Sequence, residues 1–208
     1  MTLEEALAES GIVAILRGVK PDEVLAVAEA LYSAGVRAIE VPLNSPEPFD
    51  SISRLTGEYR GRIMCGGGTM LSAAHVEKVC AAGGRLAVAP NTDPAVIRRA
   101  VSLGMTPFPG FASATEAFLA LESGARHLKL FPASTYGPGH LKALMAVLPK
   151  DAVVAPVGGV GPGDLAVWRQ AGAGCFGIGS DIYKPGMAPH EIHRRATILV
   201  AAARAALT

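Results

Sequence analysis

Residues 12–43 read IVAILRGVKPDEVLAVAEALYSAGVRAIEVPL, and this stretch decides the fold. It contains a short apolar run, Ile12–Arg17, then a helical pattern that starts with Pro21, then a second apolar run, Ala38–Leu43. Proline is favoured in the first turn of a helix, and Gly35 is suited to follow its last residue because glycine adopts the left-handed conformation without strain. The stretch therefore predicts one strand–helix–strand unit.

The same alternation of short apolar runs and helical patterns continues to the end of the chain. Six more strand-like runs follow the first two: Ile63–Gly66, Leu86–Pro90, Met105–Pro109, His127–Pro132, Val153–Gly158 and Phe176–Gly179. Eight βα units in 208 residues predict an α/β fold, a compact (β/α)8 barrel of the TIM type, with an open doubly wound sheet as the alternative. No linker or charge block divides the chain, so we expect one domain over residues 1–208, with a short N-terminal helix and a terminal helix over Ile198–Leu207.

The composition limits the classes of partner. Half of the residues are apolar, only 5% are aromatic, and the formal net charge is +1. High hydrophobicity at low net charge excludes intrinsic disorder. A balanced charge gives no field that attracts nucleic acid or an anionic membrane surface, so we expect neither as a partner.

The cysteines and the N-terminus indicate a cytoplasmic protein. Cys65, Cys80 and Cys175 are odd in number and lack the spacing of a zinc site, which suits a reducing compartment. The first residues, Met1–Ala6, are acidic where a signal peptide is basic, and no apolar stretch approaches the ~20 residues of a membrane span.

Lys129 is the most informative candidate for catalysis, because functional side chains in such barrels lie at the ends of the strands. Of the six lysines it is the only one inside a strand-like run. Alternation along the run points Leu128 and Leu130 outward and Lys129 into the barrel. Burial disfavours the charged amine and lowers its pKa, and a neutral amine can form a Schiff base with a carbonyl. The alternative is a structural lysine paired with an acid.

Glu40 faces the interior by the same alternation, between Ile39 and Val41. A buried carboxylate there can transfer protons at neutral pH. A plain salt bridge between Lys129 and Glu40 is the alternative, and the pair alone does not decide between the two.

Two glycine-rich strand ends favour a small phosphorylated substrate. Gly158 and Gly159 follow the seventh run, and Gly179 and Ser180 follow the eighth. Backbone N–H groups at such positions bind phosphate in many barrels, and the chain has neither nucleotide-binding glycine motif. Glycines that serve turn geometry alone are the alternative.

No metal and no cofactor are predicted. His190 and His193 share a helix face, but Arg194 and Arg195 beside them indicate a solvated surface. His75 and His140 have no third ligand near them in the sequence.

Several motifs in order resemble the 2-keto-3-deoxy-6-phospho-sugar-acid aldolases, from about Ile12 to Tyr183. They are Glu40-Val-Pro-Leu-Asn-Ser-Pro, Gly66-Gly-Gly-Thr-Met-Leu, Ala89-Pro-Asn, Pro109-Gly110, Lys129-Leu-Phe-Pro-Ala-Ser, Val157-Gly-Gly-Val and Gly179-Ser-Asp-Ile-Tyr. The resemblance implies a metal-free class I aldolase, a homotrimer of (β/α)8 barrels, that cleaves a small phosphorylated 2-keto-3-deoxy sugar acid to pyruvate and glyceraldehyde 3-phosphate.

The resemblance also assigns roles to individual residues. It places the Schiff-base lysine on Lys129, the general acid/base on Glu40, and the phosphate loops on Gly158, Gly159, Gly179 and Ser180. It brings Arg17 to the substrate carboxylate and Thr69 near the pyruvate carboxylate, with Asn44, Pro90 and Val157 also around the substrate. Gly67 stands where the family's G-A-G-T motif has alanine.

Arg17, Asn44 and Val157 indicate the substrate epimer. Gluconate-type relatives carry arginine and threonine at the positions of Asn44 and Val157, whereas here the arginine is supplied as Arg17. We therefore expect a preference for the phosphogalactonate substrate over its phosphogluconate epimer. A phosphate-binding isomerase or epimerase and a catalytically silent sugar-phosphate-binding barrel are the alternative functions.

Overall fold

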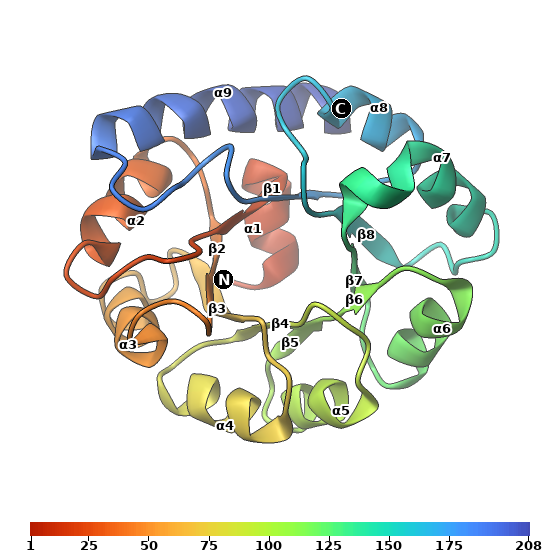
Figure 1. The fold of residues 1–208 in the computed structure, drawn as a ribbon, viewed down its shortest axis with the longest axis horizontal. Coiled ribbons are helices and arrows are strands. Elements are labelled where there is room, and N and C mark those ends of the chain that lie inside the picture. Colours follow the sequence, from red (N-terminus) through yellow and green to blue (C-terminus); the bar gives the residue numbers. More distant parts are fainter.

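A computed structural model describes all residues, Met1–Thr208, and shows parallel strands curled inside a ring of helices (Figure 1). The strands are β1 (Ile12–Ile15), β2 (Ala38–Pro42), β3 (Met64–Gly68), β4 (Leu86–Val88), β5 (Thr106–Phe108), β6 (Gly110–Phe111), β7 (His127–Leu130), β8 (Val153–Pro156) and β9 (Phe176–Ile178). The helices are α1 (Leu3–Ser10), α2 (Val24–Ser33), α3 (Pro48–Glu58), α4 (Ala73–Ala81), α5 (Pro94–Ser102), α6 (Ala114–Glu122), α7 (Ala133–Met145), α8 (Leu165–Gln170) and α9 (Pro189–Leu207).

Hydrogen bonding divides the strands into two parallel sheets, in the orders β5-β4-β3-β2-β1-β9 and β6-β7-β8. The division falls at Pro109, the last residue of the run expected over Met105–Pro109: β5 lies before it, and β6 follows it as a separate short strand. Between β8 and β9 there is one isolated bridge, from Val157 to Gly177. The predicted fold is therefore confirmed as an α/β arrangement of curled parallel strands, whereas eight strands in one closed barrel are not shown.

The buried apolar side chains form two clusters: an inner cluster enclosed by the strands, and an outer cluster between the strands and the helices. In β1, Val13 and Ile15 belong to the inner cluster, and Ile12 and Ala14 belong to the outer one. The inward orientation of Lys129 and Glu40 was predicted from the same period of two. This period separates side chains that face the interior from those that pack under the helices.

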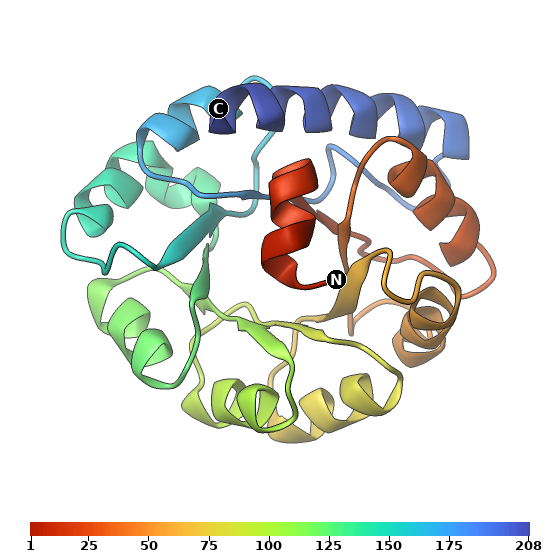
Figure 2. The same ribbon diagram turned by 180° about the vertical axis from the view of Figure 1, so that it is seen from behind.

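Helix α1 covers the end of the ring at which the strands begin (Figure 2). It is the predicted short N-terminal helix, and Thr2 and Glu5 form a capping box at its start. Leu3 and Leu7 of α1 pack into the inner cluster against strand residues such as Met64. Helix α1 thus adds its apolar side chains to the interior at this end of the ring.

Most of the helix starts and ends expected from the sequence are observed, and two helix starts differ from the expected ones. The capping box at Ser113 and Glu116 forms as predicted. The residues Gly35, Gly83, Gly124 and Gly172 follow their helices with positive φ. Helix α2 begins at Val24, because residues 21–23 form a separate turn, and the terminal helix begins at Pro189 rather than Ile198.

The three cysteines form no disulfide. Burial raises the pKa of the Cys65 and Cys175 thiols to about 12, so both stay protonated at neutral pH. None of the helices combines the length and the apolar content that a membrane span requires.

Candidate active site

Lys129 of β7 and Glu40 of β2 point toward each other inside the ring, as alternation predicted. Lys129 Nζ lies 3.9 Å from Glu40 Oε1, and the two side chains are only 6% and 2% exposed. This separation is longer than a hydrogen bond, so the groups are close without direct proton sharing. The geometry leaves the amine lone pair available to a ligand.

Burial shifts both groups toward their neutral forms. Loss of hydration lowers the pKa of Lys129, the Arg17 charge lowers it further, and the Glu40 charge opposes the shift. Loss of hydration also raises the pKa of Glu40, against the charges of Lys129 and Arg17. An amine with a lowered pKa is a better nucleophile at neutral pH, and a carboxyl with a raised pKa can both accept and return a proton.

Two further contacts surround the pair. Lys129 Nζ lies 4.9 Å from the centroid of the Phe131 ring, so the aromatic face shields the amine. Glu40 Oε2 is buried and has no hydrogen-bond partner. An oxygen of this kind can accept the proton of a ligand hydroxyl.

A cavity of about 480 Å3 opens at the end of the strands and reaches Lys129. Its lining residues are Ile15, Arg17, Thr69, Pro90, Lys129, Phe131, Val157, Gly158, Gly159, Val160, Gly179, Ser180 and Asp181. Every predicted site residue except Glu40 and Asn44 therefore lies around one cavity. Glu40 lies below it, beside a small void that it shares with Lys129 and Val157.

Asn44 contacts Arg17, one of the residues that line the cavity. Asn44 itself does not line the cavity, and its Oδ1 accepts a hydrogen bond of 2.6 Å from Arg17 Nη1. The neighbouring Ser45 hydroxyl accepts a bond of 2.9 Å from the Gly18 backbone N–H. The Asn44 side chain therefore holds the guanidinium of Arg17, and its direct contact with substrate stays a prediction.

The glycine-rich ends present unpaired backbone donors. Gly158 and Gly159 both have positive φ, at 96° and 73°. The N–H groups of Gly158, Gly159, Gly179 and Ser180 donate to no backbone carbonyl and to no side chain. Backbone N–H groups without a partner can donate to an anion.

Thr69 lies on the rim of this cavity with φ of +58°, a left-handed conformation that is uncommon for a residue other than glycine. Strained backbone of this kind clusters at functional sites.

Four lining residues were not singled out from the sequence: Ile15, Phe131, Val160 and Asp181. All four stand within two residues of a predicted site residue, which is the signal that could have marked them. The histidines stay apart from the cavity: His190 and His193 lie on α9, and the chain contains no group of three His, Cys, Asp or Glu side chains that could hold a metal.

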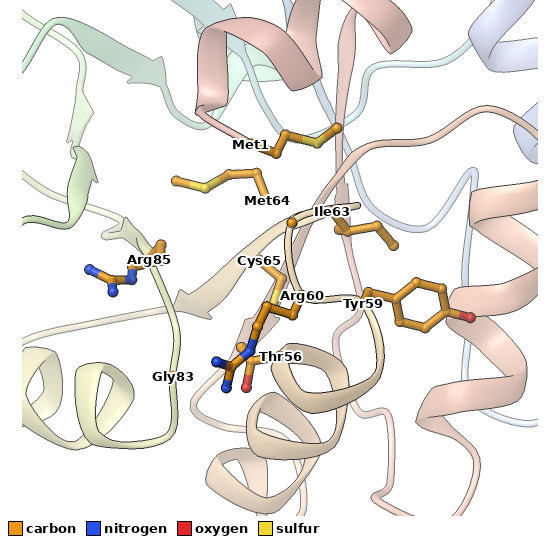
Figure 3. A pocket seen from close by; sticks show the side chains of 10 residues that line it. Met1, Thr56, Tyr59, Arg60, Ile63, Met64, Cys65, Gly83 and Arg85 are labelled. Carbon is orange, nitrogen blue, oxygen red and sulfur yellow. The ribbon is translucent and has the colours of Figure 1, made fainter.

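A second cavity, of about 370 Å3, lies near the N-terminus and the starts of β3 and β4 (Figure 3). Its lining includes Met1, Tyr59, Arg60, Met64 and Arg85. It contains none of the predicted site residues, all of which lie at or near the cavity around Lys129.

Comparison with known proteins agrees with this geometry. The family model described as "KDPG and KHG aldolase" matches residues 3–195. The chain is 47% identical to the 2-dehydro-3-deoxy-6-phosphogalactonate aldolase of Escherichia coli, over 94% of this chain and 96% of that protein. A solved structure described as native KDPGal matches with a TM-score of 0.92 and 47% identity, over 94% of this chain and 95% of that one.

A more distant structure shows a trapped covalent state. It is a KDPG aldolase from Legionella pneumophila with pyruvate captured as a covalent carbinolamine intermediate. It matches with a TM-score of 0.79 and 25% identity, over 96% of this chain and 95% of that one.

Proposed function

The chain belongs to the KDPG and KHG aldolase family, and we propose that it cleaves 2-dehydro-3-deoxy-6-phosphogalactonate to pyruvate and D-glyceraldehyde 3-phosphate. It is a class I aldolase, a carbon–carbon lyase that works through a Schiff base. The observation that carries the assignment of the site is a buried amine of lowered pKa, 3.9 Å from a buried carboxyl, below a cavity rimmed by free N–H groups.

In the proposed mechanism the neutral amine of Lys129 attacks the C2 ketone of the substrate. Loss of water leaves an iminium, which accepts electrons from the bond that breaks. Glu40 removes the proton of the C4 hydroxyl, the C3–C4 bond breaks, and glyceraldehyde 3-phosphate leaves. The remaining enamine takes a proton at C3 from Glu40, and water hydrolyses the resulting iminium to free pyruvate and Lys129.

The other cavity residues bind and orient the substrate in this proposal. Free N–H groups of Gly158, Gly159, Gly179 and Ser180 hold the phosphate. Arg17 holds the carboxylate by a charge-assisted contact. Thr69, Pro90 and Val157 shape the space between them.

The proposal also covers the fold of the whole chain and its assembly with other copies. Residues 1–208 act as one catalytic domain, with the two sheets serving as one eight-stranded barrel, and three copies associate as a homotrimer. The trimer is tested by light scattering in solution, where a mass three times the 21.3 kDa of the chain is expected. A monomeric mass at working concentration would contradict it.

Removing the guanidinium of Arg17 will lower kcat/KM about tenfold to a hundredfold, because a hydrogen bond to a charged group contributes ~1.5–3 kcal/mol. Arg17→Gln will also raise the pKa of Lys129, since the Arg17 charge lowers it. The acid side of the pH–rate profile will therefore move to higher pH. Steady-state kinetics across pH measures both effects, with Arg98→Gln on the outer surface of α5 as the matched control. An unchanged acid limb would show that Arg17 does not act on Lys129.

Val157→Thr will move the preference toward phosphogluconate. Val157 is 4% exposed and lines the cavity beside Lys129, so a hydroxyl placed there lies where it could bond one C4 epimer. One such bond changes the ratio of kcat/KM values roughly tenfold to a hundredfold, because an unpaired buried polar group costs ~1–3 kcal/mol.

The measurement is kcat/KM on both purified epimers. Val154→Thr is the control for adding a buried hydroxyl, because Val154 belongs to the outer cluster and lies on β8, the strand that Val157 follows. If the unchanged protein has an equal or higher kcat/KM for phosphogluconate than for phosphogalactonate, the epimer assignment is wrong and the aldolase assignment stands.

A further inference from the structure

We infer that Gly68 is a positioning residue, because the space left by its missing side chain is where the Glu40 carboxyl group lies. The inference rests on the proposed role of Glu40 and adds the feature of the strand that holds this group in place.

The register of β2 and β3 explains the proximity. Glu40 pairs with Gly66, and Pro42 pairs with Gly68. The Glu40 carboxyl group lies beside Gly68, so its side chain reaches along β3 to the next inward position, two residues beyond its own pairing partner. Met64, which precedes these glycines on the same face, belongs to the inner cluster. The inward positions of β3 beyond Met64 are Gly66 and Gly68, which carry no side chain, and the Glu40 carboxyl group lies in the space beside Gly68.

A methyl group on Gly68 would occupy the space in which the Glu40 carboxyl group lies. An ideal Cβ built there overlaps Oε2 and Cδ of Glu40 and lies 3.0 Å from Oε1. The three atoms of the carboxyl group are thus the ones that a side chain at this position would displace. Gly66 differs, because a Cβ on it would meet the backbone of Leu86 in the neighbouring strand.

Packing, rather than hydrogen bonding, holds the carboxyl group of Glu40. The residue is 1% exposed, and its Oε2 has no hydrogen-bond partner. With no hydrogen bond to Oε2 that would restore its position, the carboxyl group would move to the space that its packing neighbours leave. A displacement of about 1 Å in a reacting group can lower a rate about 100-fold.

The backbone at Gly68 accepts alanine, because its φ is not in the left-handed region. The Gly68→Ala variant therefore tests the space beside Glu40 rather than the strand conformation. Gly67 offers a matched control one residue away: a Cβ there faces the outer side, 2.7 Å from Val79 Cγ2 and 3.0 Å from Met70 Cε. Both side chains belong to the outer cluster, so the shift that this methyl group requires takes place among the side chains under the helices.

The experiment compares Gly68→Ala with Gly67→Ala by steady-state kinetics and by reductive trapping with pyruvate and borohydride. We expect Gly68→Ala to lower kcat about 100-fold with KM within threefold, while trapping on Lys129 is retained. We expect Gly67→Ala to stay within threefold of the unchanged protein in both constants. A kcat for Gly68→Ala within threefold of the Gly67→Ala value would overturn the inference.

A shorter acid provides the second test and covers loss of folding. Glu40→Asp retracts the carboxyl by one methylene, so it should relieve the overlap with the new methyl group. In the double variant with Gly68→Ala, the fold-loss in kcat should be smaller than the product of the fold-losses of the two single variants. If Gly68→Ala alone is unfolded, adding Glu40→Asp should restore folding. Multiplicative losses, or no recovery of folding, would contradict the inference. Failure of trapping in the unchanged protein would instead overturn the proposed function.

Discussion

Lys129→Arg and Lys129→Ala will both lose aldol cleavage, by at least about 10⁴-fold, because the covalent route accounts for much of an acceleration that in enzymes reaches ~10⁶ or more. Arginine retains charge and length, but its guanidinium stays protonated and cannot form an imine. Alanine removes the nucleophile altogether. The arginine variant therefore separates the need for a neutral amine from the need for a cation near Glu40.

The measurement is a coupled assay for pyruvate release, with circular dichroism to confirm folding. Lys142→Arg, at an exposed position of α7, is the matched control and should retain the full rate. Activity in Lys129→Arg within tenfold of the unchanged protein would show that the cation, and not an imine, supports the reaction.

Glu40→Gln will lower kcat by about 10²–10⁴-fold, the usual contribution of a general acid–base group, while imine formation persists. Glutamine has the same shape and cannot take a proton from the C4 hydroxyl. The Glu40 charge raises the pKa of Lys129, so its removal will lower that pKa further. Trapping of pyruvate should then extend to lower pH in the variant than in the unchanged protein.

Single-turnover kinetics and trapping across pH test these two outcomes together. If Glu40→Gln loses trapping as well as turnover while remaining folded, Glu40 is needed to form the imine. If trapping is retained but its acid limb moves to higher pH, the electrostatic part of the account is wrong.

Much of the site follows from the sequence, because two simple rules fix it. Alternation along a strand sets whether a side chain faces inward, and it placed Lys129 and Glu40 correctly. The ends of parallel strands meet at one end of the ring, which brought Arg17, Gly158 and Gly179 to one cavity. Neither rule requires knowledge of side-chain contacts.

Side-chain partners and strand breaks did not follow from the sequence. The sequence gives no sign that Asn44 bonds Arg17, because the two stand in different loops and meet only after folding. The division at Pro109 depends on strand register, which periodicity does not fix. The start of α2 at Val24 shows the same limit, because Pro21 is compatible with a turn as well as with a helix.

The most direct test of the central claim is the position of the covalent adduct with pyruvate. The protein is incubated with pyruvate, reduced with borohydride, digested, and mapped by mass spectrometry. A reduced pyruvyl group on Lys129 alone, with matching loss of activity, is the predicted result. An adduct on another lysine, or full activity after complete reduction, would contradict the account.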